Sequence, residues 1–278
     1  MSAQHWFVTG SSRGLGRSIV EEALAAGHRV AATARRTESL ADLAGKYGDR
    51  LLPIVLDVTD PVRAQEAVDE AIAAFGHLDV VVNNAGYANL VAIQDISLAD
   101  FRAQMEAVFY GTVHVTKAAL PHFVERGAGH FIQVTSVGGR GTAPGVGAYQ
   151  SAKWGVEGFS GVLAKEAGPL GVKVTLAEPG AMRTDWAGSS MEIPAISPQY
   201  DATVGAMGRY LRERTGREPI DPAKVARVLL DVARMPEPPL HLLLGSDAVG
   251  LIDAELKQLK AEDDRWAGLG RSVDYDAA

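Results

Sequence analysis

The sequence predicts an α/β fold, a Rossmann-like, doubly wound parallel sheet of about seven strands with helices on both faces. Short apolar or β-branched runs alternate with longer stretches of helical period along most of the 278 residues. Runs such as residues 79–82 are almost continuously apolar, as strands covered on both faces are. A glycine-rich stretch directly follows the first expected strand. Alternation of this regularity is typical of a parallel sheet between two helix layers.

The expected strands share β-branched or apolar runs of four to six residues. They are His5–Val8, Val30–Thr33, Leu52–Leu56, Val80–Asn83, Phe131–Thr135, Val172–Ala177 and Leu240–Leu244.

The expected helices fill the segments between these strands. Asp60 and Asp221 suit the N-cap, and the proline after each suits the first turn, where an amide hydrogen has no helical partner. Ser97 opens a long helix in the same way. The other helices are expected at Leu15–Ala26, Glu38–Lys46 and about Ala148–Ala167.

The whole chain, residues 1–278, is expected to form one dinucleotide-binding and catalytic domain. A stretch at about 182–220, rich in Gly, Ser and Pro, is expected to be irregular and to form a substrate loop, since long loops in compact domains are usually functional. Its apolar side chains suit an apolar substrate or could equally be packing. Residues of about 247–278 carry apolar positions at helical spacing and are expected to form a tail that covers the loop or contacts a partner chain.

Composition excludes several classes of function. The chain has no cysteine, and its seven histidines show no metal-ligand spacing, so no metal site is expected. The net charge of -7, without a dense basic stripe, gives no footprint for nucleic acid or anionic lipid. No apolar run is long enough for a membrane span, and the first strand begins too early for a signal peptide, so we expect a cytoplasmic protein with a small-molecule substrate.

The first expected strand runs into the sequence Thr9–Gly16, TGSSRGLG, and then into a helix. Glycine allows the tight turn and lets the backbone approach phosphates, while the free amides and dipole of the helix N-terminus favour negative charge. A glycine-rich turn without a ligand is the alternative, but the position after the first strand favours a pyrophosphate site. The expected cofactor contacts here are Gly10, Ser12, Arg13, Gly14, Leu15 and Gly16.

The end of the second strand predicts which nicotinamide cofactor is bound. NAD(H) sites usually carry an acidic residue ~20 residues after the glycines, on the ribose 2′-hydroxyl. This sequence instead has Arg35 and Arg36 there. Arg35 and Arg13 can both pair with a 2′-phosphate, so NADP(H) is preferred and NAD(H) remains possible. Arg36 could be an ordinary solvated residue.

Further cofactor contacts are expected where the third and fourth strands end, because ligands of open α/β sheets bind at that edge. Asp57 could accept a hydrogen bond from an adenine amino group, with Val58 beside it. Asn84, Ala85 and Gly86 follow the fourth strand, and Asn side chains in such places also satisfy turn backbone groups. The two roles are compatible.

Three polar residues predict the chemistry. Tyr149 and Lys153 lie four residues apart on one helix face, a spacing that alone is common on exposed helices. Ser136, however, ends the fifth strand at the same sheet edge. A phenol with a pKa of about 10 is a poor acid at neutral pH, and a nearby ammonium lowers it. We therefore expect Ser136, Tyr149 and Lys153 to be catalytic in reducing a carbonyl or oxidising a secondary alcohol.

Together these motifs resemble the single-domain short-chain dehydrogenase/reductase family over about residues 5–245. The matching patterns are TGxxxGxG at 9–16, NNAG at 83–86, YxxxK at 149–153 and PGxxxT at 179–184. The resemblance implies that Tyr149 is the acid/base, that Lys153 also binds the nicotinamide ribose and that Ser136 holds the substrate oxygen. It adds Pro179, Gly180 and Thr184 to the cofactor site, with Thr184 on the carboxamide.

The resemblance extends to the hydroxysteroid and retinol dehydrogenase branch, whose substrates are bulky and apolar. Family members commonly pair through the helix that bears the Tyr and the helix before it, so a homodimer or homotetramer is expected.

One position departs from the family. Its members usually carry a catalytic Asn in an Asn-x-x-Gly stretch, and here that stretch is Val108-Phe109-Tyr110-Gly111. Val108 has no amide to position the water that connects the active-site Lys to solvent. The expectation is slowed but real catalysis. The alternative is an NADP(H)-binding sensor or scaffold with little turnover. An epimerase or dehydratase is disfavoured because the loop is not GxxGxxG.

Overall fold

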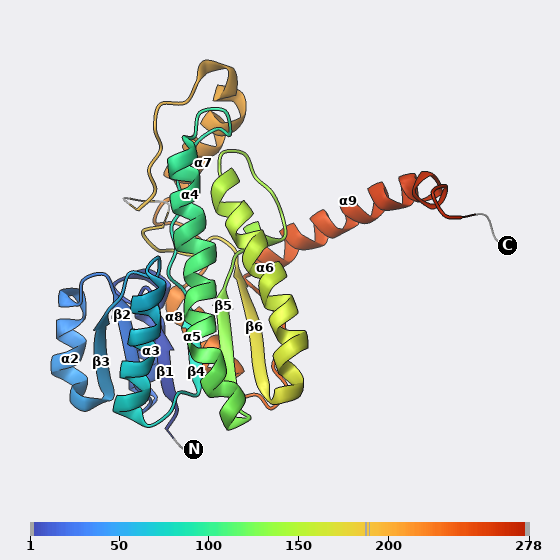
Figure 1. Cartoon of the computed structure of the whole chain (residues 1–278). Helices are drawn as coiled ribbons and strands as arrows, with labels where there is room; N and C mark the ends of the chain where they lie inside the picture. Colours follow the sequence, from blue (N-terminus) through green and yellow to red (C-terminus); the bar gives the residue numbers. More distant parts are fainter. Residues whose placement is uncertain (1–2, 187, 189, 276–278) are drawn as a thin grey trace.

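The computed structural model describes residues 3–186, 188 and 190–275. Its core is one parallel sheet with the strand order β3-β2-β1-β4-β5-β6-β7, so the predicted fold class is confirmed (Figure 1). The order reverses between β1 and β4, and ligands of such sheets bind at this switch point. The strands are β1 His5–Val8, β2 Arg29–Ala34, β3 Leu51–Val55, β4 Val80–Asn83, β5 Gly129–Val134, β6 Val172–Pro179 and β7 His241–Leu244.

Three of the described α-helices begin where the sequence places capping residues. The Asp60 carboxylate accepts hydrogen bonds from two first-turn amides, and the Asp221 carboxylate accepts one, as does the Ser97 hydroxyl. The α-helices are α1 Gly14–Ala25, α2 Ala41–Tyr47, α3 Pro61–Phe75, α4 Leu98–Met105, α5 Gly111–Arg126, α6 Gly147–Ala167, α7 Ala206–Arg214, α8 Pro222–Ala233 and α9 Ser246–Arg271.

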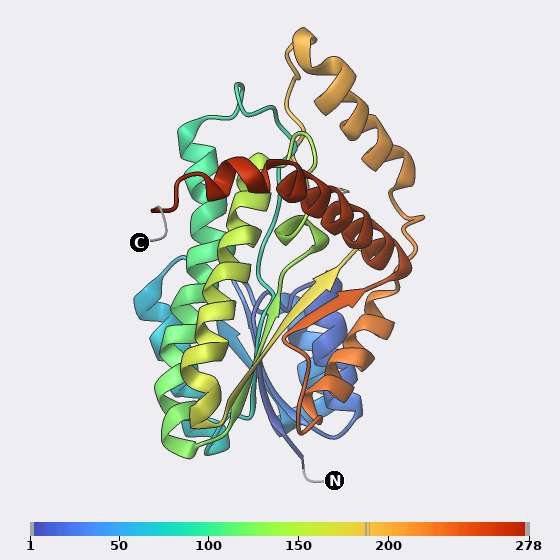
Figure 2. The ribbon, with the colours of Figure 1, turned by 90° about the vertical axis from the view of Figure 1, so that its right-hand side faces the viewer.

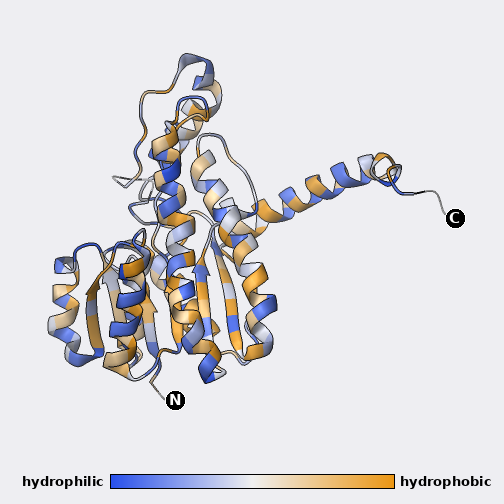
Figure 3. Ribbon diagram, viewed as in Figure 1, coloured by the Kyte–Doolittle hydropathy of each residue, from blue (hydrophilic) through white to orange (hydrophobic). Residues whose placement is uncertain are grey.

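Two helix layers bury the two faces of the sheet, which explains why the strands are apolar on successive residues (Figure 3). Trp6 and Val8 of β1 pack into the core that α1, α2 and α8 cover, whereas Phe7 packs into the core under α3, α5 and α6. Alternate residues of a strand point to opposite faces, so an apolar residue is required at each position. The resulting rigid sheet fixes the ends of β1, β4, β5 and β6 at one edge.

The segment at 182–220 is not irregular throughout, contrary to the expectation from its composition. It contains a 3-10 turn at Pro198–Tyr200, a π-helical turn at Asp201–Gly205 and helix α7. Part of this segment is helical because its apolar residues recur at helical spacing. The prediction from composition did not take this spacing into account. These residues pack in a third core beside Tyr149, and they are Tyr200, Val204, Met207 and Leu211.

The tail from residue 246 is the helix α9, which leaves the body of the molecule (Figures 1 and 2). Ala248 and Ile252 of its first turns are buried, whereas most of its later apolar residues are exposed. In the described part of the chain, no helix combines the length and apolar character that a membrane crossing needs.

Candidate active site

A cavity of about 800 Å³ lies at the carboxyl edge of the sheet, where the strand order reverses. It brings together nearly all of the residues that the sequence analysis selected. The predicted residues that line it are Gly10, Ser12, Arg13, Gly14, Leu15, Arg35, Asp57, Val58, Asn84, Ala85, Gly86, Ser136, Tyr149, Lys153, Pro179, Gly180 and Thr184.

Gly16 does not line this cavity, and its role is packing. A Cβ atom at Gly16 would lie 2.3 Å from the carbonyl oxygen of Gly10 and 2.4 Å from Nδ2 of Asn84. Gly10 has a φ of +67°, and its Cβ would lie 2.9 Å from the Cα of Ala85. Only glycine fits at these two positions, because the start of α1 and the loop after β1 press against the end of β4.

The loop after β1 presents backbone amides to the cavity. Arg13 is the extended N-cap residue of α1, and no side chain caps the helix. The first amides of α1 are therefore available to an anion, and the helix dipole favours one. This arrangement fits a dinucleotide pyrophosphate.

Asn84 ties the ends of β1 and β4 together. Its Nδ2 donates to the carbonyl oxygens of Thr9 at 2.9 Å and of Gly10 at 3.2 Å, and its backbone amide donates to the Thr9 hydroxyl at 2.9 Å. Asn83 points into the core instead, where its amide donates to Thr116 and Gln133. Asn84 therefore satisfies backbone groups of the turn, as Asn often does in such places, and it also lines the cavity.

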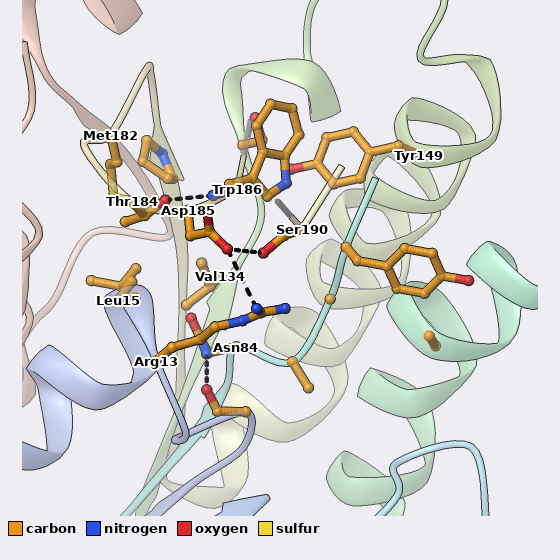
Figure 4. A pocket seen from close by; sticks show the side chains of 18 of the residues that line it. Arg13, Leu15, Asn84, Val134, Tyr149, Met182, Thr184, Asp185, Trp186 and Ser190 are labelled. Carbon is orange, nitrogen blue, oxygen red and sulfur yellow. Dashed lines mark hydrogen bonds and ion pairs between the residues drawn. The ribbon is translucent and has the colours of Figure 1, made fainter. Parts of the chain in front are cut away.

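Three charged residues that were expected to contact the cofactor line the cavity, and they are Arg13, Arg35 and Asp57. Arg35 is exposed and lines the cavity, whereas the exposed Arg36 is not among the lining residues. The Arg13 guanidinium forms an exposed ion pair of 3.4 Å with the carboxylate of Asp185, which belongs to the segment after β6 (Figure 4). Asp57 accepts hydrogen bonds from the amide and hydroxyl of Thr59, which hold its carboxylate at the rim.

Ser136, Tyr149 and Lys153 meet at the inner end of the cavity. Ser136 follows β5, and its Oγ accepts a hydrogen bond from the amide of Gly138 at 3.0 Å. Tyr149 and Lys153 lie in the first two turns of α6, and the Lys153 ammonium is 5.7 Å from the centre of the Tyr149 ring. The ammonium donates to the carbonyl oxygen of Val134 at 2.6 Å. The phenol, the ammonium and the hydroxyl therefore converge as the sequence predicted.

Burial shifts both titrating groups toward their neutral forms. Desolvation raises the pKa of Tyr149 to about 12, although a hydrogen bond with Ser136 opposes the rise. Desolvation lowers the pKa of Lys153 to about 8, and the charge of Glu157 opposes that fall. A positive charge bound beside the phenol favours the phenolate and lowers its pKa.

Thr184 and Gly180 complete the wall after β6. The Thr184 hydroxyl accepts from the amide of Trp186 at 3.3 Å. A Cβ at Gly180 would lie 2.5 Å from the Asp247 carboxylate, which accepts from the amide of Ala181 at 2.9 Å. A side chain at position 180 would therefore displace the Asp247 carboxylate from its place at the start of α9.

Val108 lies in a π-helical turn, Glu106–Tyr110, that interrupts the long helix between α4 and α5. Such turns are frequent at functional sites. Val108 is fully buried, and a Cβ built on Gly86 would lie 3.5 Å from a Val108 methyl and 3.9 Å from the Lys153 ammonium. The apolar side chain of Val108 and the Lys153 ammonium are thus both neighbours of Gly86.

The sequence analysis missed several residues at the site. Trp186 packs on Tyr149, and Glu157 lies one turn after Lys153 on α6, a spacing that could have identified it. Arg140, Glu178 and His241 surround Glu157 but come from distant parts of the chain, so no local pattern reveals them.

Residues 4–193 match the short chain dehydrogenase family. The chain belongs to this family. Oxidoreductase BOA17 of Botryotinia fuckeliana is 51% identical over 265 residues, which are 95% of this chain and 97% of that protein. Among solved structures, a short-chain dehydrogenase from Streptomyces avermitilis has a TM-score of 0.93 at 38% identity and covers 99% of this chain and 100% of its own. The closed form of serine dehydrogenase complexed with NADP+ has a TM-score of 0.74 at 27% identity, with 87% and 94% covered.

These relatives identify this short-chain dehydrogenase as an oxidoreductase that acts between alcohols and carbonyls with a nicotinamide cofactor. The family predicted from the sequence motifs is confirmed.

Proposed function

We propose that this short-chain dehydrogenase uses NADP(H) to interconvert a carbonyl and a secondary alcohol on an apolar substrate. The observation that carries the proposal is the convergence of the Ser136 hydroxyl, the Tyr149 phenol and the Lys153 ammonium on one cavity. A carbonyl oxygen in that space can accept hydrogen bonds from both hydroxyls, and such donors stabilise the negative charge that develops on it.

NADP(H), which Gly14, Arg35 and Thr184 would help to hold, would supply or accept the hydride. In the reduction, the carbonyl carbon gains the hydride and Tyr149 gives its proton to the carbonyl oxygen. Ser136 holds that oxygen, and Lys153 stabilises the phenolate that remains. In the oxidation, the phenolate takes the alcohol proton. The buried position of Tyr149, 8% exposed, keeps bulk water from the transfer.

Two features support NADP(H) over NAD(H). Arg35 lines the cavity at the sequence position where an acidic residue would read a free 2′-hydroxyl, and Arg13 lines the same cavity. A guanidinium binds phosphate with two parallel hydrogen bonds. The serine dehydrogenase to which the chain is similar binds NADP+.

An apolar substrate is supported by the wall beyond the catalytic residues. Trp186, Tyr210 and Leu211 line the cavity, and Trp186 and Leu211 also pack against the third core with most other apolar residues of the 190–211 segment. Aromatic and aliphatic walls with a few polar groups are typical of sites for apolar ligands.

A second candidate function is NADP(H) binding with little turnover. Val108 favours it, since a buried apolar side chain stands at the position where the family carries an amide. The intact Ser136, Tyr149 and Lys153 argue for catalysis.

The test is the consumption of NADPH, followed by its absorbance, across apolar ketones, aldehydes and quinones. We expect turnover with at least one class and its loss, by a factor of about 100 or more, in Tyr149→Phe. NADPH binding without turnover on every compound would favour the second candidate.

We also propose that the chain forms a homo-oligomer through α5 and α6. The supporting observation is a set of apolar side chains left exposed on or next to these helices, Tyr110 at 43%, Trp154 at 48% and Val162 at 54%. Sedimentation velocity measures the oligomer directly, and a monomer at micromolar concentration would contradict the proposal.

A further inference from the structure

A group of four charged or ionisable side chains lies behind Lys153, on the side away from the cavity. Glu157 comes from α6, Glu178 from β6, His241 from β7 and Arg140 from the loop after β5. One ligand atom from each of Glu157, Glu178 and His241 lies within 4.8 Å of the others. Arg140 supplies a fixed positive charge to the same group.

The two carboxylates in this group are not equivalent. Glu178 is fully buried. One of its carboxylate oxygens lies 2.9 Å from a guanidinium nitrogen of Arg140, and the other lies 2.7 Å from Nδ1 of His241. The Glu157 side chain is only 9% exposed, and in the described chain neither of its oxygens has a hydrogen-bond partner. Nδ1 of His241 lies 3.5 Å from one of the Glu157 carboxylate oxygens.

Burial raises the pKa of Glu157 to about 7. The Thr135 hydroxyl opposes this rise, and the charge of Glu178 adds to it. Glu157 therefore gains and loses its proton near neutral pH.

Glu157 follows Lys153 by one helical turn, so both side chains lie on the same face of α6. Among the described residues, Glu157 is the charged group that acts on the Lys153 ammonium, and it raises the pKa of that ammonium against desolvation. Val108, which is also a neighbour of Gly86, has no polar side-chain atom. A buried carboxylate outside the cavity thus lies one helical turn from Lys153 and favours the charged form of its ammonium.

We propose that Glu157 is a positioning residue for the reaction, whose ionised carboxylate keeps Lys153 protonated and so sets the pH range in which Lys153 can stabilise the Tyr149 phenolate. This inference rests on the proposed function for its effect on turnover, but the effect on Lys153 is independent of turnover.

Every element packed against Glu157 contributes to its titration. Arg140 and His241 oppose the rise in its pKa, Glu178 adds to it, and Lys153 stands on the same helix. Glu255 of α9 approaches the same loop, since a Cβ at Gly141 would lie 3.4 Å from the Glu255 side chain. The group is thus enclosed from α6, β6, β7, the loop after β5 and α9.

Glu157→Gln tests the inference through a pH profile of kcat/KM for NADPH-dependent reduction. Below about pH 6 the wild-type Glu157 is protonated and matches the neutral Gln, so we expect equal activities. Above pH 7 only the wild type carries the charge, so the variant loses Lys153 protonation earlier and its alkaline limb moves to lower pH. The ratio of the wild-type kcat/KM to that of Glu157→Gln should grow to about tenfold by pH 8 to 9. Glu166→Gln, an exposed site on the same helix, is the matched control and should follow the wild type throughout. A loss of equal size at all pH values would mean a merely structural role and would overturn the inference.

A second measurement separates this inference from the proposed function, because it needs no substrate. In protein labelled with ¹³C at lysine Cε, the Lys153 signal is assigned by its absence in Lys153→Met, and its titration is followed by NMR. We expect its midpoint to fall in Glu157→Gln and to stay unchanged in Glu166→Gln. An unchanged midpoint in Glu157→Gln overturns the inference. A lowered midpoint in a protein that turns over no substrate would support the role of Glu157 and contradict only the proposed function.

Discussion

The indole ring of Trp186 lies against the phenol ring of Tyr149, with the ring centres 5.4 Å apart and the planes inclined by 58° (Figure 4). Trp186 comes from the segment after β6, which Met191 anchors in the third core. The segment that closes the cavity therefore contacts the group that we propose as the acid/base. This contact helps to exclude water from Tyr149 and forms part of the apolar wall.

Trp186→Ala should weaken catalysis on apolar ketones. The change removes an aromatic pair and an apolar wall, together worth about 2 to 3 kcal/mol, so kcat/KM should fall by roughly 30- to 150-fold. Trp266→Ala, at an exposed position on α9, is the control and should keep the wild-type value. Steady-state kinetics checks this, and wild-type kinetics in Trp186→Ala would mean that this wall does not contact the substrate.

Arg35→Asp should reverse the cofactor preference. A charge-assisted hydrogen bond is worth about 1.5 to 3 kcal/mol, so NADPH affinity should fall by roughly 10- to 150-fold while NADH affinity changes little. Arg36→Asp changes the neighbouring charge but does not alter the cavity lining, and it should have a much smaller effect. Fluorescence titration with both cofactors measures this. Equal losses for NADPH and NADH would show that Arg35 does not read the 2′-phosphate.

Val108→Asn should raise kcat. The new amide would lie next to Gly86, which also neighbours the Lys153 ammonium. There it could hold a water molecule that returns protons to the Lys153 and Tyr149 pair, and an increase of roughly 3- to 10-fold is expected for improved proton transfer. Val108→Ala removes the Val108 methyl groups but adds no amide, so it should not raise kcat. If Asn and Ala behave alike, the Val108 side chain does not limit turnover.

His130 should make the fold sensitive to acid. This residue of β5 is 3% exposed, Nε2 lies 2.9 Å from the Thr175 hydroxyl, and burial lowers the pKa of His130 to about 4. The unfolded chain takes up this proton near pH 6.5. The stability that neutral His130 contributes is therefore present above pH 6.5 and is lost as the pH falls toward 4, by about 3 kcal/mol.

Urea unfolding at pH 7, 5.5 and 4.5 checks this dependence. His130→Gln cannot titrate, so its free energy of unfolding should fall less steeply over the same range than that of the wild type. Parallel slopes in the two proteins would show that other groups cause the acid sensitivity.

Local signals explain how much of the fold the sequence could predict. Asp60, Ser97 and Asp221 start their helices by bonding amides two or three residues away, so a short window of sequence suffices. Helix α7 was missed because its helical spacing of apolar residues was not separated from the surrounding loop, and the π-helical turn at Glu106–Tyr110 was missed although Phe109 of this turn packs on Phe159 of α6.

The same distinction applies to the site. Ser136, Tyr149 and Lys153 could be found because two lie on one helix and the third ends a neighbouring parallel strand. The ion pair of Arg13 with Asp185 spans 172 residues. The group around Glu157 is assembled only when β6 and β7 pair, so its partners carry no mark in the sequence.

The most direct test of the account is hydride transfer itself. NADPH deuterated at both C4 positions is incubated with the enzyme and its best ketone, and the product alcohol is analysed by mass spectrometry. We predict one deuterium on the carbinol carbon with the wild type and none above background with Tyr149→Phe. Binding of NADPH with no deuterium in the product of any ketone tested would contradict the account.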